Sequence, residues 1–227
     1  MRTLMLSLTL LLAAALPVHA QQPPALPGLV EGVQYAPIKD GKPFRAQPAG
    51  KIEVIEVFSY GCPHCAHMQP KLETWEATLP KSVVVSYMPA AFSRDDPFML
   101  GYFAADAAKA VPVTHNRMFA AVHETQELGR NATLEQVSAY YLRLPGVNGK
   151  VFTAALADQA GMTRKVQAAR DFQVRSNIPG TPALIVDGRY MVLGNSYESL
   201  LGNARKIIDV IAGSRKPAGK TPPKPRS

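Results

Sequence analysis

The sequence predicts an α/β fold in which two groups of strands are separated by a block of helices. Strand-like segments occur at 51–58 and 82–88 and again at 183–186 and 190–192, whereas residues 95–169 have only helical patterns. The predicted order is therefore strand–helix–strand, a helical block, then strand–strand–helix. With 227 residues, 47% of them hydrophobic, the chain can bury a core without a disulfide scaffold.

Residues 1–20 have the features of a secretory signal peptide. Arg2 precedes an apolar run from Leu4 to Leu16, and Val18 and Ala20 stand at the −3 and −1 positions of a cleavage site. As a helix this run would rise less than about 20 Å, which is too short for a hydrocarbon core of about 30 Å. We expect cleavage after Ala20 and export to an oxidising periplasm.

Both flanks of the exported chain are predicted to lack regular structure. Residues 21–29 form a Pro-rich, flexible lead-in, and residues 213–227 hold five basic residues, four prolines and no acid, as in a disordered tail. The net charge of +8 falls to +7 without Arg2 and to +2 without that tail. The basic charge is thus mainly a property of the tail, and we expect no nucleic-acid partner.

A strand–helix–strand unit is predicted at 51–88. The segment 51–58 reads KIEVIEVF, which is typical of a buried central strand. A helix then begins at Pro63 and contains Pro70, which is expected to kink it. Its apolar stripe consists of Met68, Leu72, Trp75 and Leu79. The segment 82–88, SVVVSYM, predicts the second strand, reached by a right-handed crossover.

Residues 95–161 are predicted to form an inserted helical domain. Proline and glycine mark the ends of its four helices, at 98–110, 113–125, 134–144 and 151–157. Asn131 or Thr133 is the expected N-cap of the third. A further helix at 163–174 leads back to the strands.

The last segments complete a discontinuous domain of residues 30–94 and 162–212. Strands are predicted at 183–186 and 190–192, and Asp187-Gly188 between them is a strong signal for a two-residue hairpin. A final helix at about 197–212 is apolar on one side.

The two cysteines, Cys62 and Cys65, are the only ones in the chain, and three kinds of site use such a pair. A structural disulfide would close a very short loop and constrain the unfolded chain little. A zinc site needs four ligands, of which this pair supplies two, so we expect no metal. A dithiol redox site is favoured because the C-x-x-C motif follows a buried strand and opens a helix.

The position of the pair explains why it would react. Cys62 is expected at a helix N-terminus, where unpaired N–H groups and the helix dipole stabilise a thiolate. Pro63 suits the first turn because its missing N–H would have no partner there. His64 can add a charge or a hydrogen bond to the Cys62 sulfur. Cys65, one turn further on, is expected to be more buried.

Glu56 interrupts the apolar strand six residues before Cys62. It could lie on the exposed face of an edge strand. We favour the alternative, a buried carboxyl beneath the cysteines with a raised pKa, which would relay a proton for Cys65.

A Thr181-Pro182 bond directly before a strand is the other unusual feature. Taken alone, a trans proline that opens the strand is the simpler interpretation. A cis bond would be a specific turn device and would leave the backbone of Thr181 free to pair with an extended substrate.

Together these motifs resemble the thioredoxin superfamily and, more narrowly, the DsbA-type periplasmic thiol:disulfide oxidoreductases. The resemblance covers about residues 30–212. It rests on EVFSYGCPHC at 56–65, on the helical block, and on GTPA at 180–183 followed by the hairpin. It implies an α/β thioredoxin fold interrupted by an inserted helical domain.

The resemblance also implies roles for the site residues. Cys62 would be the nucleophile and Cys65 its buried partner, while His64 would stabilise the Cys62 thiolate. Glu56 would be the family's buried acid, and Pro182 the cis-proline that faces the disulfide.

Two residues depart from the family pattern. Thr181 stands where the best-known members carry Val, and Pro70 is more like thioredoxin itself. Both bear on oxidising strength and substrate preference.

The expected function is oxidation of dithiols in newly exported proteins, with the Cys62–Cys65 disulfide as redox carrier and no other cofactor. The resemblance implies a DsbB-like, quinone-linked membrane protein as reoxidant, met in transient contacts, and we expect a monomer. A disulfide isomerase or reductase with the same residues, and a non-catalytic chaperone or binding module, are the alternatives.

Overall fold

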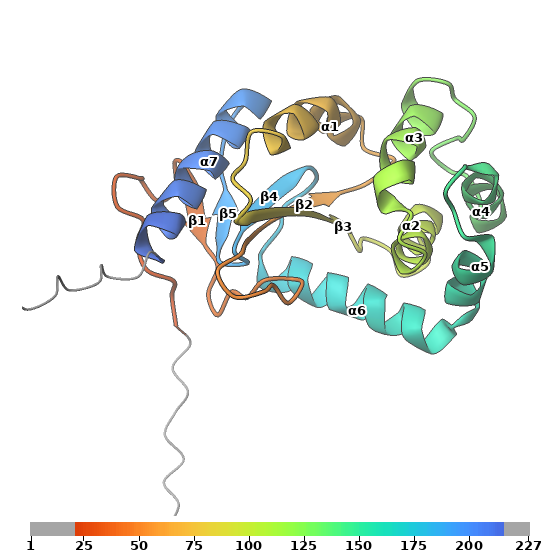
Figure 1. Ribbon diagram of the computed structural model, residues 1–227, viewed down its shortest axis with the longest axis horizontal. Coiled ribbons are helices and arrows are strands. Elements are labelled where there is room, and N and C mark those ends of the chain that lie inside the picture. Colours follow the sequence, from red (N-terminus) through yellow and green to blue (C-terminus); the bar gives the residue numbers. More distant parts are fainter. Residues whose placement is uncertain (1–20, 216–227) are drawn as a thin grey trace, which may run out of the picture.

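The computed structural model describes residues 21–215. The predicted signal peptide and residues 216–227 of the predicted tail lie outside the described residues. Within them, a five-stranded sheet carries helices on both faces, and four further helices lie beyond one edge of the sheet (Figure 1).

The strands follow the order β1-β5-β4-β2-β3 across the sheet. The central strand β2 (Ile52–Phe58) is buried along its whole length; it pairs in parallel with β3 (Val83–Pro89) and antiparallel with β4 (Ala183–Val186). The hairpin from β4 to β5 (Tyr190–Val192) turns at Asp187 and Gly188, both with positive φ, as the Asp-Gly signal predicts. The edge strand β1 (Tyr35–Pro37), which pairs with β5, was not predicted.

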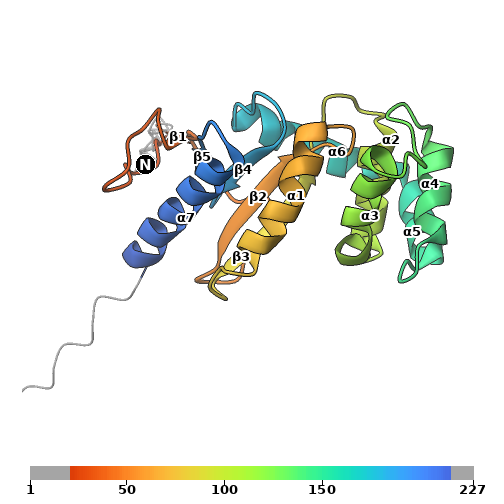
Figure 2. The same cartoon turned by 90° about the horizontal axis from the view of Figure 1, so that it is seen from above.

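Helices cover the two faces of the sheet unequally. Figures 1 and 2 show α1 (Pro63–Glu76) and α7 (Tyr197–Ser214) on one face and α6 (Gln159–Arg175) across the other. Alternation along β2 supplies both cores, because Val54 belongs to the cluster under α1 and α7 whereas Ile55 and Val57 belong to the cluster that includes α6. Pro70 lies inside α1, as the sequence indicates.

The helices α2 (Pro97–Ala107), α3 (Val111–His123), α4 (Leu134–Arg143) and α5 (Gly149–Ala157) form the insertion. Thr133 caps α4 in a capping box with Gln136, which decides between the two caps considered. The helix α6 begins at Gln159, earlier than predicted, because the Asp158 side chain accepts a hydrogen bond from the Gly161 N–H. The α/β class with a helical insertion is confirmed.

The flanks are more ordered than predicted. In the lead-in, Leu26 is buried and its N–H donates to the Tyr35 hydroxyl at 3.1 Å. At the other end, α7 runs to Ser214, beyond the predicted start of the tail, and the Arg215 guanidinium binds the buried Asp187 carboxylate at 2.6 Å. An apolar contact and an ion pair therefore hold these residues.

No helix within residues 21–215 combines the length and the apolar character that a bilayer crossing requires. The domain boundaries themselves stay predictions.

Candidate active site

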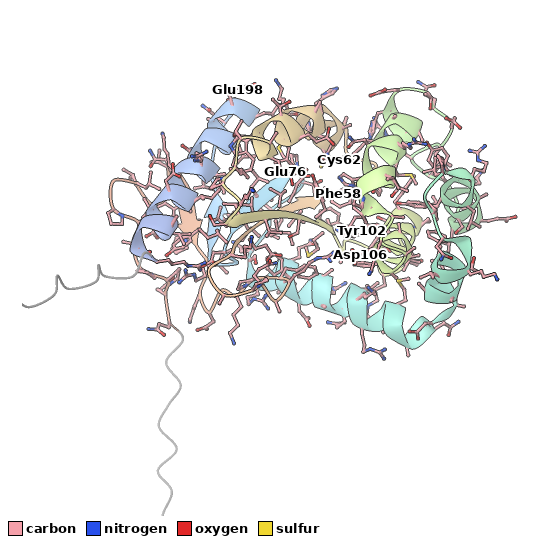
Figure 3. The ribbon with its side chains drawn as sticks, in the orientation of Figure 1. Phe58, Cys62, Glu76, Tyr102, Asp106 and Glu198 are labelled. Atoms are coloured by element: carbon pink, nitrogen blue, oxygen red, sulfur yellow. The ribbon has the colours of Figure 1, made fainter. Side chains whose placement is uncertain are left out.

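The cysteine pair lies where β2 gives way to α1. Cys62, which is labelled in Figure 3, is the N-cap of α1. Its backbone dihedrals are extended, and Pro63 occupies the first turn. Cys65 follows one turn later and is completely buried, whereas Cys62 is partly exposed. Both are free cysteines in the structure. Solvent and partners therefore reach Cys62 first.

The surroundings of Cys62 favour its thiolate. Burial opposes ionisation, but hydrogen bonds from the Thr181 side chain, from the N–H and thiol of Cys65 and from the His64 N–H outweigh it, so the Cys62 pKa is lowered. As a neutral thiol, Cys62 donates to the Thr181 carbonyl at 3.3 Å. Thr181 thus accepts a hydrogen bond from the Cys62 thiol through its carbonyl oxygen and donates one to the Cys62 thiolate through its side chain.

Cys65 has the opposite character. Burial raises its pKa, and the negative charge of Glu56 raises it further. The pair is therefore asymmetric, because its surroundings favour the thiolate at the accessible sulfur and the neutral thiol at the inner sulfur.

Glu56 lies in the middle of β2 and is completely buried, which excludes the exposed-edge alternative. Neither carboxyl oxygen has a hydrogen-bond partner among the described residues. Burial, and secondly the negative charge of Cys62, raises its pKa to about 8. At neutral pH this carboxyl is mostly protonated and holds a proton beside the cysteines.

The Thr181–Pro182 bond is cis and directly precedes β4. It forms one side of a groove of about 590 Å³ whose other walls come from β5 and the start of α7. His64 also lines this groove, and its ring Nδ1 lies 3.5 Å from the Tyr197 hydroxyl. The His64 ring is thus directed toward α7, while the residue meets the Cys62 sulfur through its backbone N–H.

The structure therefore brings together all seven residues singled out in the sequence, which are Glu56, Cys62, Pro63, His64, Cys65, Thr181 and Pro182. Their catalytic roles remain predictions. Tyr197 was missed, because nothing local to the start of the last helix shows that it meets α1.

Two histidines of the insertion were also missed. The Tyr60 hydroxyl lies 2.9 Å from Nδ1 of His115, and His123 Nε2 donates to the Tyr60 carbonyl at 2.7 Å. Burial lowers the His115 pKa to about 3, so its ring is neutral. The only sequence signal is that the two histidines stand eight residues apart, which places them on one face of a helix.

Within residues 21–215, no group of three His, Cys, Asp or Glu side chains is placed to hold a metal ion. That the redox chemistry needs no cofactor besides the cysteines stays a prediction.

Comparison with known proteins gives consistent results. The Thioredoxin family model Thioredoxin_4 matches residues 40–206. The thiol:disulfide interchange protein DsbA of Bordetella parapertussis is 34% identical over 214 residues, which cover 91% of this chain and 96% of that protein. DsbA of Pseudomonas syringae is 30% identical over 222 residues, 96% and 100% of the two chains.

Solved structures agree. The oxidoreductase DsbA from Xylella fastidiosa has 37% sequence identity and a TM-score of 0.71, over 82% of this chain and 97% of that one. Reduced DsbA1 from Neisseria meningitidis has 26% identity and a TM-score of 0.69, over 83% and 97%. With a C-x-x-C pair at the start of α1, one cysteine partly exposed and one buried, and with a helical insertion between β3 and β4, the chain belongs to the DsbA-type branch of the thioredoxin superfamily and is a thiol:disulfide oxidoreductase.

Proposed function

We propose that this protein is a periplasmic oxidase that donates a Cys62–Cys65 disulfide to newly exported proteins. The observation that carries the proposal is the asymmetry of the pair, because an exposed sulfur with a lowered pKa stands beside a buried one with a raised pKa. A stabilised thiolate favours the reduced enzyme and so makes the disulfide a stronger oxidant. This favours oxidation over isomerisation or reduction.

The reaction begins with attack on Cys62. A substrate thiolate forms a bond to the Cys62 sulfur, and the Cys62–Cys65 bond breaks with its electron pair leaving on Cys65. A second substrate thiolate then attacks the substrate sulfur of the mixed disulfide and releases Cys62 as a thiolate. The substrate loses two electrons to form its disulfide, and the enzyme gains them as a dithiol.

Glu56 supplies the proton that the leaving sulfur needs. Its pKa of about 8 lies below that of Cys65, so transfer from the neutral carboxyl to the Cys65 thiolate is favourable. The resulting Glu56 carboxylate, without a hydrogen-bond partner among the described residues, readily takes up another proton.

The groove beside Pro182 holds the substrate. An extended chain can place its cysteine at Cys62 and pair with the backbone at Thr181, while side chains enter the space in front of Tyr197. Reduced exported proteins are the substrates and a DsbB-like, quinone-linked membrane protein is the reoxidant, met only in transient contacts. We place the monomeric enzyme in the periplasm after cleavage following Ala20, with no nucleic-acid partner and no cofactor beyond the disulfide.

Serine variants test the mechanism. Incubated with a reduced two-cysteine protein, oxidised wild type should yield oxidised substrate and no stable adduct. Cys65→Ser, activated at Cys62 as a mixed disulfide with glutathione, should exchange glutathione for a substrate variant that keeps one cysteine and should hold it, because that substrate has no second thiolate to release Cys62. Cys62→Ser should form no such adduct. If substrate adducts formed at Cys65 and not at Cys62, Cys65 would be the nucleophile and Cys62 its partner, the reverse of the assigned roles.

A glutathione redox titration tests the direction. Thioredoxin has a reduction potential of about −270 mV, and we expect the potential of the Cys62–Cys65 couple to lie well above that value. A value near thioredoxin's would contradict an oxidase and favour a reductase. Absence of any reactive thiol near neutral pH would favour a non-catalytic binding module.

A further inference from the structure

The turn that leads from β2 into α1 is held at its centre by a residue of the insertion. The turn comprises residues 59–62 and is closed by the Cys62 N–H, which donates to the Ser59 carbonyl at 3.0 Å. Between these two residues, the Tyr60 carbonyl accepts a hydrogen bond from His123 Nε2 at 2.7 Å. His123 is the last residue of α3. The insertion therefore holds the main chain two residues before the accessible sulfur.

A four-residue turn of this kind has two common forms, which differ in the orientation of the central peptide. In the type II form the third residue has a positive φ, which glycine adopts about as readily as a negative one. Gly61 occupies this position, yet it is not among the glycines of residues 21–215 that have positive φ. The turn is therefore not of type II, although its glycine permits that form.

The hydrogen bond from His123 distinguishes between the two forms. Passing to type II rotates the Tyr60–Gly61 peptide by roughly 150°, so its carbonyl oxygen would leave the His123 ring. The N–H of the same peptide donates to the Ser59 hydroxyl at 3.3 Å, and the rotation would break this contact as well. Both ends of the central peptide are thus bonded in the orientation observed.

The His123 ring is itself held in place. It is half-buried and packs on Phe119, one turn earlier in α3, with a centroid distance of 6.3 Å. The Tyr60 side chain is buried, and its hydroxyl meets His115, two turns earlier in the same helix. One helix therefore contacts Tyr60 at its hydroxyl and at its carbonyl, and only the second contact acts on the backbone.

The orientation of this turn matters to both sulfurs. Cys62 ends the turn and caps α1, and the N–H groups of His64 and Cys65 stabilise its thiolate there. Ser59, which begins the turn, directs its N–H to the Cys65 sulfur. In the disulfide a covalent bond ties Cys62 to α1, whereas in the dithiol only the turn and the hydrogen bonds keep it in place. A loosened turn would therefore destabilise the reduced form more than the oxidised form.

We propose that His123 is a positioning residue of the redox reaction. By holding the Tyr60 carbonyl, it keeps the central peptide of the turn from rotating and keeps Cys62 at the N-terminus of α1, where its thiolate is stabilised. The insertion thereby contributes to the reactivity of the cysteine pair through one backbone hydrogen bond. This inference rests on the proposed redox role of Cys62 and holds for oxidation and reduction of substrates alike.

Two substitutions separate the hydrogen bond from the packing of the ring. His123→Phe keeps a ring against Phe119 and removes the donor, whereas His123→Gln places an amide N–H near the position of Nε2. In a glutathione redox titration, the equilibrium of His123→Phe should shift toward the disulfide by about three- to tenfold, as expected for the loss of one hydrogen bond. A tenfold shift corresponds to about 30 mV. His123→Gln should stay within about twofold of wild type.

Alkylation of Cys62 measured against pH gives a second readout, the Cys62 pKa. This pKa should rise in His123→Phe and stay at the wild-type value in His123→Gln. The matched control is His115→Phe, which removes the bond to the Tyr60 hydroxyl and leaves the carbonyl bond intact, so it should titrate like wild type at Cys62. Equal titrations of wild type and His123→Phe, or equal shifts in both phenylalanine variants, would overturn the proposal.

A measurement on wild type does not depend on the variants. The proton of the neutral His123 ring should lie on Nε2, because a carbonyl oxygen can only accept, and ¹⁵N NMR distinguishes the two tautomers. A proton on Nδ1 would refute the contact. The absence of a reactive thiol in wild type would contradict the proposed function, whereas equal reactivity of wild type and His123→Phe would contradict only the role of His123. The two failures are therefore distinguishable.

Discussion

The Tyr60 hydroxyl lies 2.9 Å from Nδ1 of His115, and this contact joins the loop before the cysteines to helix α3. The His115 ring is also packed among aromatic rings, with centroid distances of 4.3 Å to Tyr87, 4.7 Å to Phe58 and 5.1 Å to Phe119. A residue of the insertion thus holds the side chain of Tyr60, two residues before Cys62.

Replacing His115 by phenylalanine should keep the packing and remove the hydrogen bond. We expect a loss of about 1–3 kcal/mol at pH 7.5, because the buried Tyr60 hydroxyl is left unpaired. Urea unfolding measures this loss.

The same variant should change the acid dependence of stability. Burial lowers the His115 pKa from 6.5 to about 3, so between these values the unfolded chain binds a proton that the native protein does not. The stability present above pH 6.5 is therefore lost as the pH falls toward 3, by up to about 1.4 kcal/mol per pH unit. His115→Phe should have a flatter profile, and the exposed His67→Gln should keep the wild-type one. Parallel profiles for His115→Phe and wild type would show that His115 is not the group responsible.

Replacing Glu56 by glutamine should stabilise the protein increasingly as the pH rises. The pKa of Glu56 is raised from 4.5 to about 8, so in this range the native state binds a proton that the unfolded state has lost. Wild-type stability falls across this window by up to about 1.4 kcal/mol per pH unit, and the variant escapes that loss. The free energy of unfolding of wild type and of Glu56→Gln, measured at pH 5 and at pH 8, tests this prediction.

Glu56→Gln should also slow substrate oxidation at pH 7 by about tenfold, since the amide cannot supply a proton to Cys65. Single-turnover kinetics measure the rate, with Glu135→Gln as the surface control. A variant with an unchanged rate would exclude Glu56 as the proton donor.

Replacing Thr181 by valine should raise the Cys62 pKa, because the side-chain hydrogen bond to the thiolate is lost. One hydrogen bond contributes about 0.5–1.5 kcal/mol, so alkylation of the reduced enzyme below the Cys62 pKa should slow about 2- to 10-fold. Thr181→Ser keeps the hydroxyl and should react like wild type. If both variants react alike, the hydroxyl is not the stabilising group.

Gly101 should not tolerate a side chain. A Cβ there would lie 2.8 Å from both Tyr141 and Val137, where α2 packs on α4, so Gly101→Ala should cost about 1–3 kcal/mol. Gly202, inside α7, has nothing within 4 Å of such a Cβ, and Gly202→Ala should stabilise by about 0.5–1 kcal/mol. Thermal unfolding measures the stability of both variants. Equal changes in stability for Gly101→Ala and Gly202→Ala would show that close packing between α2 and α4 does not exclude a side chain at Gly101.

Periodicity predicted the regular elements closely, and β4 and β5 coincide with their predicted ranges. The strand β1 escaped because it has only three residues, one of them a proline, and exists through its pairing with β5. Periodicity also could not separate the two glutamates of β2. The Glu53 carboxylate accepts hydrogen bonds from the Phe44 N–H at 2.8 Å and from the Ser86 hydroxyl at 2.8 Å, whereas Glu56 has none.

The candidate site divides in the same way. Cys62 and Cys65 could be predicted from the sequence, because their spacing and the strand before them lie within ten consecutive residues, 56–65. The contact between Tyr60 and His115 spans 55 residues and depends on how the insertion docks.

The helix α6 crosses from the insertion to the sheet without a break. Its 17 residues extend about 25 Å; it packs on α2 and α5, and its C-terminal end leads into the loop that carries Pro182. Near that end, the Gln173 side chain accepts a hydrogen bond from the Ala91 N–H in the loop after β3. A tilt of the insertion would therefore move the Pro182 loop through α6 and the Tyr60 loop through α3 at once, so the gap that admits a substrate thiol would open and close as one mechanical unit.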